Sequence, residues 1–305
     1  MNDQSNTQAN AASVTLDSQK AEPAVMSATR PFYWSVRREL WEHRSIYLAP
    51  LAVAGVTLLG FLIASLGRAL TTQDLALRRQ ILEEPPLFAA LLIMLAAFIV
   101  TIFYCLDALH GERRDRSILF WKSLPVSDLT AVLAKASIPL VVIPLITFAI
   151  TVATQWLMLL VSTAVLAGSG LNVAPLWTHW PQMWLMLLYH LLAVHSLWYA
   201  PIYAWMLLVS AWARRTPFLW AFLPLLVCSF VERIAFNSWH FAAFLGYRLS
   251  GELAGAELKD GSMAMDPTMF TPGRLLSSPG LWAGLIFAAL CIAAAARLRR
   301  YRGPI

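Results

Sequence analysis

The chain reads ASIPLVVIPLITFAITVATQWLMLLVSTAVLAG from Ala136 to Gly168, and it continues to Ala213 without a single Asp, Glu, Lys or Arg residue. A membrane-spanning helix needs about 20 apolar residues to cross roughly 30 Å of hydrocarbon. This run is too long for one span, and the segment 168–181, rich in Gly, Pro and Asn, divides it into two. The stretch therefore predicts an all-α protein that crosses a membrane more than once.

The composition of the whole chain supports the same fold class. Apolar residues make up 59% of the sequence and charged residues only 13%, whereas soluble domains carry about 45–50% and about 25%. So little charge cannot cover a soluble globule, which excludes a soluble enzyme, a disordered chain and a coiled coil. The three cysteines form no CxxC pair and no Cys/His cluster, so neither a disulfide framework nor a metal site is expected.

Six segments are long and apolar enough to span a membrane. They cover residues 46–66, 87–107, 132–160, 183–210, 218–236 and 280–297. The third contains Pro139 and Pro144, which predict a kink or a tilt. Residues 46–305 are therefore expected to form a six-span transmembrane domain.

The distribution of Lys and Arg predicts the orientation of these spans. When the N-terminus is placed in the cytoplasm, most of the 23 basic residues fall in cytoplasmic segments, as the positive-inside rule requires. An even number of spans then places both termini inside. The net charge of +6 is explained by these loops, and no contact with nucleic acid is expected.

Four of the segments outside the predicted spans have patterns of their own. Residues 1–28 are polar and predict a disordered cytoplasmic tail. Residues 29–45 predict an amphipathic helix in the headgroup layer, with a solvated cytoplasmic helix as the alternative. Residues 108–131 form a charged cytoplasmic loop, and residues 237–279 form an external region that is interfacial or re-entrant.

The cytoplasmic loop has a local pattern of its own. The segment from Glu112 to Lys122 predicts one short helix, with acidic charge near its start and basic charge near its end. Leu124-Pro125 ends it, because the residue before a proline avoids the helical region. Ser127 is then placed to cap the helix that leads into the third span.

Large apolar residues within this loop, Ile118, Leu119 and Trp121, have no lipid in which to be buried. A groove on another protein is a natural place for them. The alternative is a positively charged loop that only fixes topology. Arginines alone would satisfy topology, so the apolar residues favour the docking interpretation.

The loop resembles the permease subunits of type-2 ABC (ATP-binding cassette) transporters. Those proteins carry a stretch of the form Glu-Arg-x-x-Gly-Ser/Thr, several apolar residues, then Leu-Pro-Val/Ile-Ser and a downstream Lys. The residues that match are Glu112, Arg113, Ser117, Leu124, Pro125, Val126, Ser127 and Lys135. Arg116 stands where the family often has Gly. With the six-span layout and the N-terminal helix, the resemblance covers residues 30–302.

The resemblance implies a coupling helix that docks into a separate ATPase and transmits its closure to the spans. The residues it assigns to ATPase coupling are Glu112, Arg113, Arg114, Asp115, Ser117, Ile118, Leu119, Trp121 and Pro125. It implies two such permease chains, identical or different, in the lipid of a bacterial inner membrane, with two cytoplasmic ATPases bound beneath them. Export is the expected direction, because the family consists mainly of exporters.

No phosphate-binding sequence of the form GxxxxGK[ST] occurs in the chain, so it is not expected to be an enzyme. It is expected to hold no cofactor, while ATP and Mg²⁺ are bound by the partner ATPase.

Polar residues in or near the spans are candidates for a substrate path. They are Glu232 and Arg233 at the outer end of the fifth span, and Tyr189, His190 and His195 in the fourth. The alternatives are a charged pair that reaches interfacial water, and hydrogen bonds between helices. On an α-helix, a five-residue separation would place the two histidines about 140° apart, which argues against a metal site.

Two other function classes remain as alternatives. The first is a membrane sensor or scaffold that does not transport. The second, an intramembrane serine protease, needs a Gly-x-Ser-Gly nucleophile within a span and a histidine in a later one. Ser169 of this chain lies in a predicted external turn, and the last span contains no histidine, so the protease interpretation is weak.

Overall fold

The computed structural model describes residues 29–65, 67, 84–123, 126–168, 173–178, 180–250 and 276–303. Within these ranges all regular secondary structure is helical, as the composition predicts. Several predicted features lie outside the described residues. They are the tail 1–28, residues 251–275 of the external region, Ser169, and the Leu124-Pro125 pair predicted to end the loop helix. Predictions about these segments stay predictions.

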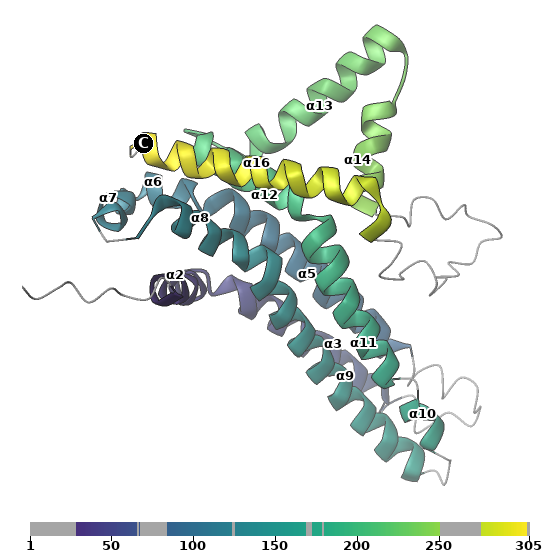
Figure 1. The fold of residues 1–305 in the computed structure, drawn as a ribbon. Helices are drawn as coiled ribbons and strands as arrows, with labels where there is room; N and C mark the ends of the chain where they lie inside the picture. The colour runs from purple at the N-terminus through teal and green to yellow at the C-terminus, as the bar shows by residue number, and fades with distance from the viewer. Residues whose placement is uncertain are drawn as a thin grey trace, which may run out of the picture.

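The first two described helices meet at a sharp angle. Helix α2 (Thr29–Glu42) lies across the direction of the long helices, and α3 (Ser45–Ala64) then runs along them (Figure 1). The helix predicted over residues 29–45 is thus present but ends at Glu42. Its placement in a headgroup layer stays a prediction.

The second and third predicted spans are continuous helical paths. The second is α5 (Pro85–Asp107). The third runs through α8 (Asp128–Ser137), the π-helical turn η2 (Ile138–Val142) and α9 (Ile143–Gly168). Pro139 cannot donate a backbone hydrogen bond, and the helix widens around it. The irregularity expected from the prolines is therefore a local π-helical turn.

The fourth predicted span is broken. It begins with α10 (Ala174–Thr178) and α11 (Trp180–His190), widens into the π-helical segment η3 (Leu191–Trp198), and continues as α12 (Ala200–Trp212). The two halves meet at an angle of 47°. Among the described residues, five helices can cross a membrane by length and composition, and this bent pair gives a sixth when counted as one span. The chain is a multi-pass, all-α membrane protein.

The last two long helices are α13 (Pro217–Phe236) and α16 (Pro279–Tyr301). Helix α14 (His240–Ser250) follows α13 and returns to the start of α16, where Arg248 donates a 3.1 Å hydrogen bond to the carbonyl of Gly280. The α13–α14 hairpin projects away from the other helices (Figure 1). Only 6% of the apolar 18-residue stretch of α13 is buried within the chain. The corresponding stretches of the other four full-length spans are 22–39% buried.

The core lies where α3, α5, α8, α9 and α12 meet, and α16 packs along α12. Its largest fully buried side chains include Ile46, Ile138, Tyr203 and Leu207. Helix α2, the loop after α5 and the C-terminal end of α16 all lie at one end of the molecule (Figure 1).

Candidate functional site

The loop after α5 forms two short helices, α6 (His110–Arg114) and α7 (Ser117–Lys122). Between them Arg116 adopts the left-handed conformation, with φ of 59°. A left-handed residue ends a right-handed helix, so the single helix predicted from Glu112 to Lys122 is wrong. The cap predicted at Ser127 is confirmed, because its hydroxyl accepts a hydrogen bond from the backbone N–H of Thr130.

Glu112 is the centre of a buried network of charges. Its carboxylate accepts hydrogen bonds from Arg38 Nη2 at 2.8 Å and from Arg299 Nη1. Lys135 Nζ lies 3.3 Å from the same carboxylate. The three cations come from α2, α16 and α8, so one side chain of α6 joins three other helices.

A second carboxylate completes this network. Glu39 of α2 accepts a 2.8 Å hydrogen bond from Lys135 Nζ and a 3.0 Å hydrogen bond from the Tyr104 hydroxyl. Arg299 also donates from Nε to Asp128 at 3.1 Å. Charges removed from water are costly unless each has a close partner, and here the buried ones are paired.

The guanidinium of Arg38 lies at the edge of the network. Burial alone lowers the pKa of Arg38, but the hydrogen bonds to Glu42 and Glu112, together with the negative charges of Glu39 and Glu112, raise the pKa above its ordinary value. The same guanidinium lies 3.5 Å from the centroid of the Trp121 ring, which is a cation–π contact. Arg38 thus ties α7 as well as α6 to α2.

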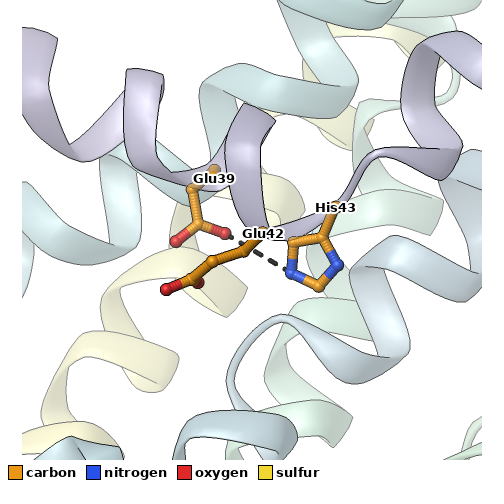
Figure 2. A group of neighbouring side chains, drawn as sticks. All are labelled: Glu39, Glu42 and His43. Atoms are coloured by element: carbon orange, nitrogen blue, oxygen red, sulfur yellow. Dashed lines mark ion pairs between the residues drawn. The ribbon is translucent and has the colours of Figure 1, made fainter.

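Three neighbouring side chains, Glu39 and Glu42 of α2 and His43 directly after it, are of the types that bind metals (Figure 2). Their oxygens already have other partners, since Glu39 accepts from Lys135 and Glu42 accepts from Arg38. His43 Nε2 lies 3.8 Å from Glu39. A metal ion beside His43 would compete with the Tyr104 hydroxyl for Glu39 and with the Arg38 guanidinium for Glu42, so we assign these residues to the ion-pair network.

Arg113, next to Glu112, points to a different helix. Its Nη1 donates to the carbonyl of Ala211 at 2.7 Å and to that of Ala213 at 3.2 Å. The backbone N–H of His110 donates to Ser210 Oγ at 2.9 Å. The last carbonyls of a helix lack partners within the helix, and a cation is favourable at that end. Arg113 therefore caps α12.

The second short helix, α7, has one buried and one open face. Ile118 is 1% exposed, whereas Leu119 is 58% and Phe120 is 61% exposed. Trp121 is half-buried beneath Arg38. Phe120 belongs to the apolar run that favours docking, but it is not among the residues that the resemblance assigns to ATPase coupling.

The other predicted coupling residues have varied surroundings. Arg114 is exposed, with Asp115 at 3.0 Å and Asp107 at 3.8 Å. The hydroxyl of Ser117 donates to the carbonyl of Glu112 at 3.4 Å. Glu112, Arg113 and Ile118 are buried within the chain, so their side chains hold the loop in place.

The candidate substrate-path residues at the end of α13 have partners within their own turn. Glu232 accepts hydrogen bonds from Ser238 Oγ, from the backbone N–H of His240 at 2.8 Å and from that of Phe241 at 2.7 Å. It thereby caps α14. Arg233 donates to the carbonyl of Asn237 at 3.1 Å.

The candidates in the fourth span lie in and before a π-helical segment. Tyr189 and His190 end α11 half-buried, and His195 is buried in η3 within 3.3 Å of the Tyr203 hydroxyl. Hydrogen bonds from residue i to i+5 bring residues five apart to one side, so the angle of 140° expected for an α-helix does not apply. Figure 1 shows the junction of α11 and α12, where this segment lies, far from the C-terminal end of α13, so one chain does not assemble these candidates into a single site.

Comparison of the chain with family models, with curated proteins and with solved structures finds no match. Functional inference therefore depends on the residues of this chain.

Proposed function

We propose that the chain is the permease subunit of an ATP-driven transporter of the type-2 ABC class, and that a separate ATPase docks on α7. The observation that carries the proposal is the open face of this short helix. Leu119 and Phe120 point outward at the end of the molecule where α2 and the last turn of α16 also lie. Two large apolar side chains outside the spans favour a protein partner.

The conformation of Arg116 adds support for the proposed family. This position is the one at which type-2 permeases often carry Gly, and here it has a φ of 59°. Glycine adopts positive φ without steric cost. The chain therefore has, at that position, the backbone that the glycine of the family would favour.

The ion-pair network connects the loop mechanically to the spans. Glu112 is paired with cations of α2, α8 and α16, and Arg113 caps α12. In the proposed mechanism, ATP and Mg²⁺ bind to the partner ATPases and draw them together. The α6–α7 loop follows, and the attached helices shift to open the passage outward, which corresponds to export.

A second permease chain is part of this proposal, and α13 is the helix proposed to meet it. Its apolar side chains are largely exposed, and so is the thiol of Cys228 midway along it, whereas Cys105 and Cys291 are buried. In native membranes, oxidation should then give a disulfide-linked pair of permease chains. Cys228→Ser should abolish the pair and Cys291→Ser should not. A pair that survives Cys228→Ser would contradict this use of α13.

The test of the proposed function is purification of the tagged chain from its native membranes in mild detergent. An ATP-hydrolysing subunit should copurify at about one copy per permease. Leu119→Ser should remove it, while Leu129→Ser, at a similarly exposed leucine on α8, should not. A folded preparation without such a subunit would contradict the proposal and favour a membrane sensor or scaffold.

A further inference from the structure

A groove with a volume of about 390 Å³ separates α2 from α7 and the start of α8. Its lining combines three tryptophans with four cations and one carboxylate. These residues are Trp34, Trp41, Trp121, Arg37, Arg38, Lys122, Arg299 and Asp128. The groove therefore has an excess of positive charge and apolar aromatic walls.

The cations of the groove are of two kinds. Arg38 and Arg299 are paired with Glu112 and belong to the network described above. Arg37 and Lys122 have no carboxylate partner among the described residues. Arg37 lies 5.1 Å from the Trp34 ring centroid and 4.9 Å from that of Trp41. Lys122 Nζ donates to the carbonyls of Arg300 and Arg302. An anion bound in the groove would pair with these two positive charges.

The surroundings of the groove favour a lipid as the source of this anion. Helix α2 lies across the long helices at the point where the first of them begins (Figure 1). Its Trp34 and Trp41 are largely exposed, and tryptophan is enriched at the boundary between hydrocarbon and headgroups. Basic pockets at the cytoplasmic ends of spans are sites for acidic headgroups. A soluble anion would not need tryptophan walls.

We propose that this groove binds the headgroup phosphate of an acidic phospholipid, held between Arg37 of α2 and Lys122 of α7. The lipid would fix the distance between α2 and the loop. Leu119 and Phe120 do not line the groove, so the lipid site and the proposed ATPase surface occupy different faces of α7. The lipid proposal therefore does not depend on the ATPase.

The test measures lipid binding to the purified, detergent-solubilised chain. Short-chain phosphatidylglycerol and short-chain phosphatidylcholine are titrated separately, and binding is followed as a rise in Tm. We expect saturable binding of phosphatidylglycerol and at least tenfold weaker binding of phosphatidylcholine. In the double variant Arg37→Gln/Lys122→Gln the Kd for phosphatidylglycerol should rise about thirtyfold, at about 1 kcal/mol for each basic residue.

The matched control is Arg214→Gln/Arg215→Gln, which removes the same charge from exposed positions outside the groove. This control should bind like the unchanged chain. If the double groove variant does not fold, the single variants Arg37→Gln and Lys122→Gln are tested instead. Each should bind phosphatidylglycerol about fivefold more weakly than the unchanged chain.

Several results would overturn the lipid proposal. They are equal binding by the groove variant and the unchanged chain, an equal loss in the control, and equal binding of both lipids. Inorganic phosphate that raises Tm as much as phosphatidylglycerol would assign the groove to a free anion. If the groove variant still binds lipid but no longer copurifies with the ATPase, the groove would be assigned to a protein partner.

Discussion

The dipeptide Glu-Arg occurs twice next to the spans, as Glu112-Arg113 after α5 and as Glu232-Arg233 near the end of α13. The first pair is buried, and its partners lie up to 190 residues away in the sequence. The second pair is more open, and its hydrogen-bond partners are at most nine residues away. The same two residue types thus join distant helices in the loop after α5 and close a local turn after α13.

This difference shows that residue type alone does not define the role of a charged residue beside a membrane. Glu112 and Arg113 are surrounded by α2, α8, α12 and α16, so burying them requires partners from those helices. Glu232 and Arg233 lie on a helix that projects from the others, where the turn into α14 supplies their partners. Glu112 and Arg113 contact several helices, so a movement of their loop can be transmitted to those helices. Among the described residues, the hydrogen-bond partners of Glu232 and Arg233 lie in their own turn, so this pair cannot transmit a movement in this way.

The largest difference is expected when each glutamate loses its charge. Glu112→Gln leaves Lys135 and Arg299 buried without their shared carboxylate, and we expect a loss of about 3–5 kcal/mol. Glu232→Gln keeps an acceptor oxygen for the α14 cap and should cost much less than Glu112→Gln. Thermal unfolding in detergent, followed by dye labelling of the buried thiols Cys105 and Cys291, measures both. Equal losses would remove the distinction between the two pairs.

A smaller difference is expected for the arginines. Arg113→Gln removes a charged donor from the carbonyls that end α12 and should cost about 2 kcal/mol. Arg233→Gln, at an exposed position, should change stability by about 0.5 kcal/mol or less. The same unfolding measurement compares the two variants. A larger loss at Arg233 would show that the α13–α14 turn is the more tightly held region.

The smallest difference is expected for two serines that organise these regions. Ser127→Ala removes the cap of α8, the helix that carries Lys135, and should cost about 1 kcal/mol. Ser238→Ala removes one donor to Glu232, while the backbone N–H groups of His240 and Phe241 remain, so a loss of about 0.5 kcal/mol or less is expected. A Ser127→Ala variant as stable as the unchanged chain would show that α8 is held by the network alone.

Much of the helical architecture could be predicted from the sequence, because apolar runs and caps are local signals. The span predicted over 46–66 corresponds to Ser45–Ala64, and that predicted over 218–236 corresponds to Pro217–Phe236. The cap at Ser127 could also be predicted, since Ser followed by Asp at the start of an apolar run is a common start of a helix.

The candidate site could be predicted only in part. The importance of Glu112 and Lys135 was visible through the resemblance, but their contact with each other and with Glu39 and Arg299 joins residues as many as 187 positions apart. No local pattern encodes such pairing. The left-handed Arg116 was also unpredictable from residue type, because arginine rarely adopts that conformation.

The open face of α7 is the central feature of the proposed function, and a contact measurement tests it most directly. A photo-crosslinker is attached at Phe120→Cys, in a chain whose exposed Cys228 is changed to Ser, and irradiated in native membranes. Phe218→Cys, at a similarly exposed phenylalanine at the start of α13, is the matched control. We predict that position 120 captures an ATP-binding chain and that position 218 does not. Capture of no such chain at position 120, or equal capture at both positions, would contradict the account.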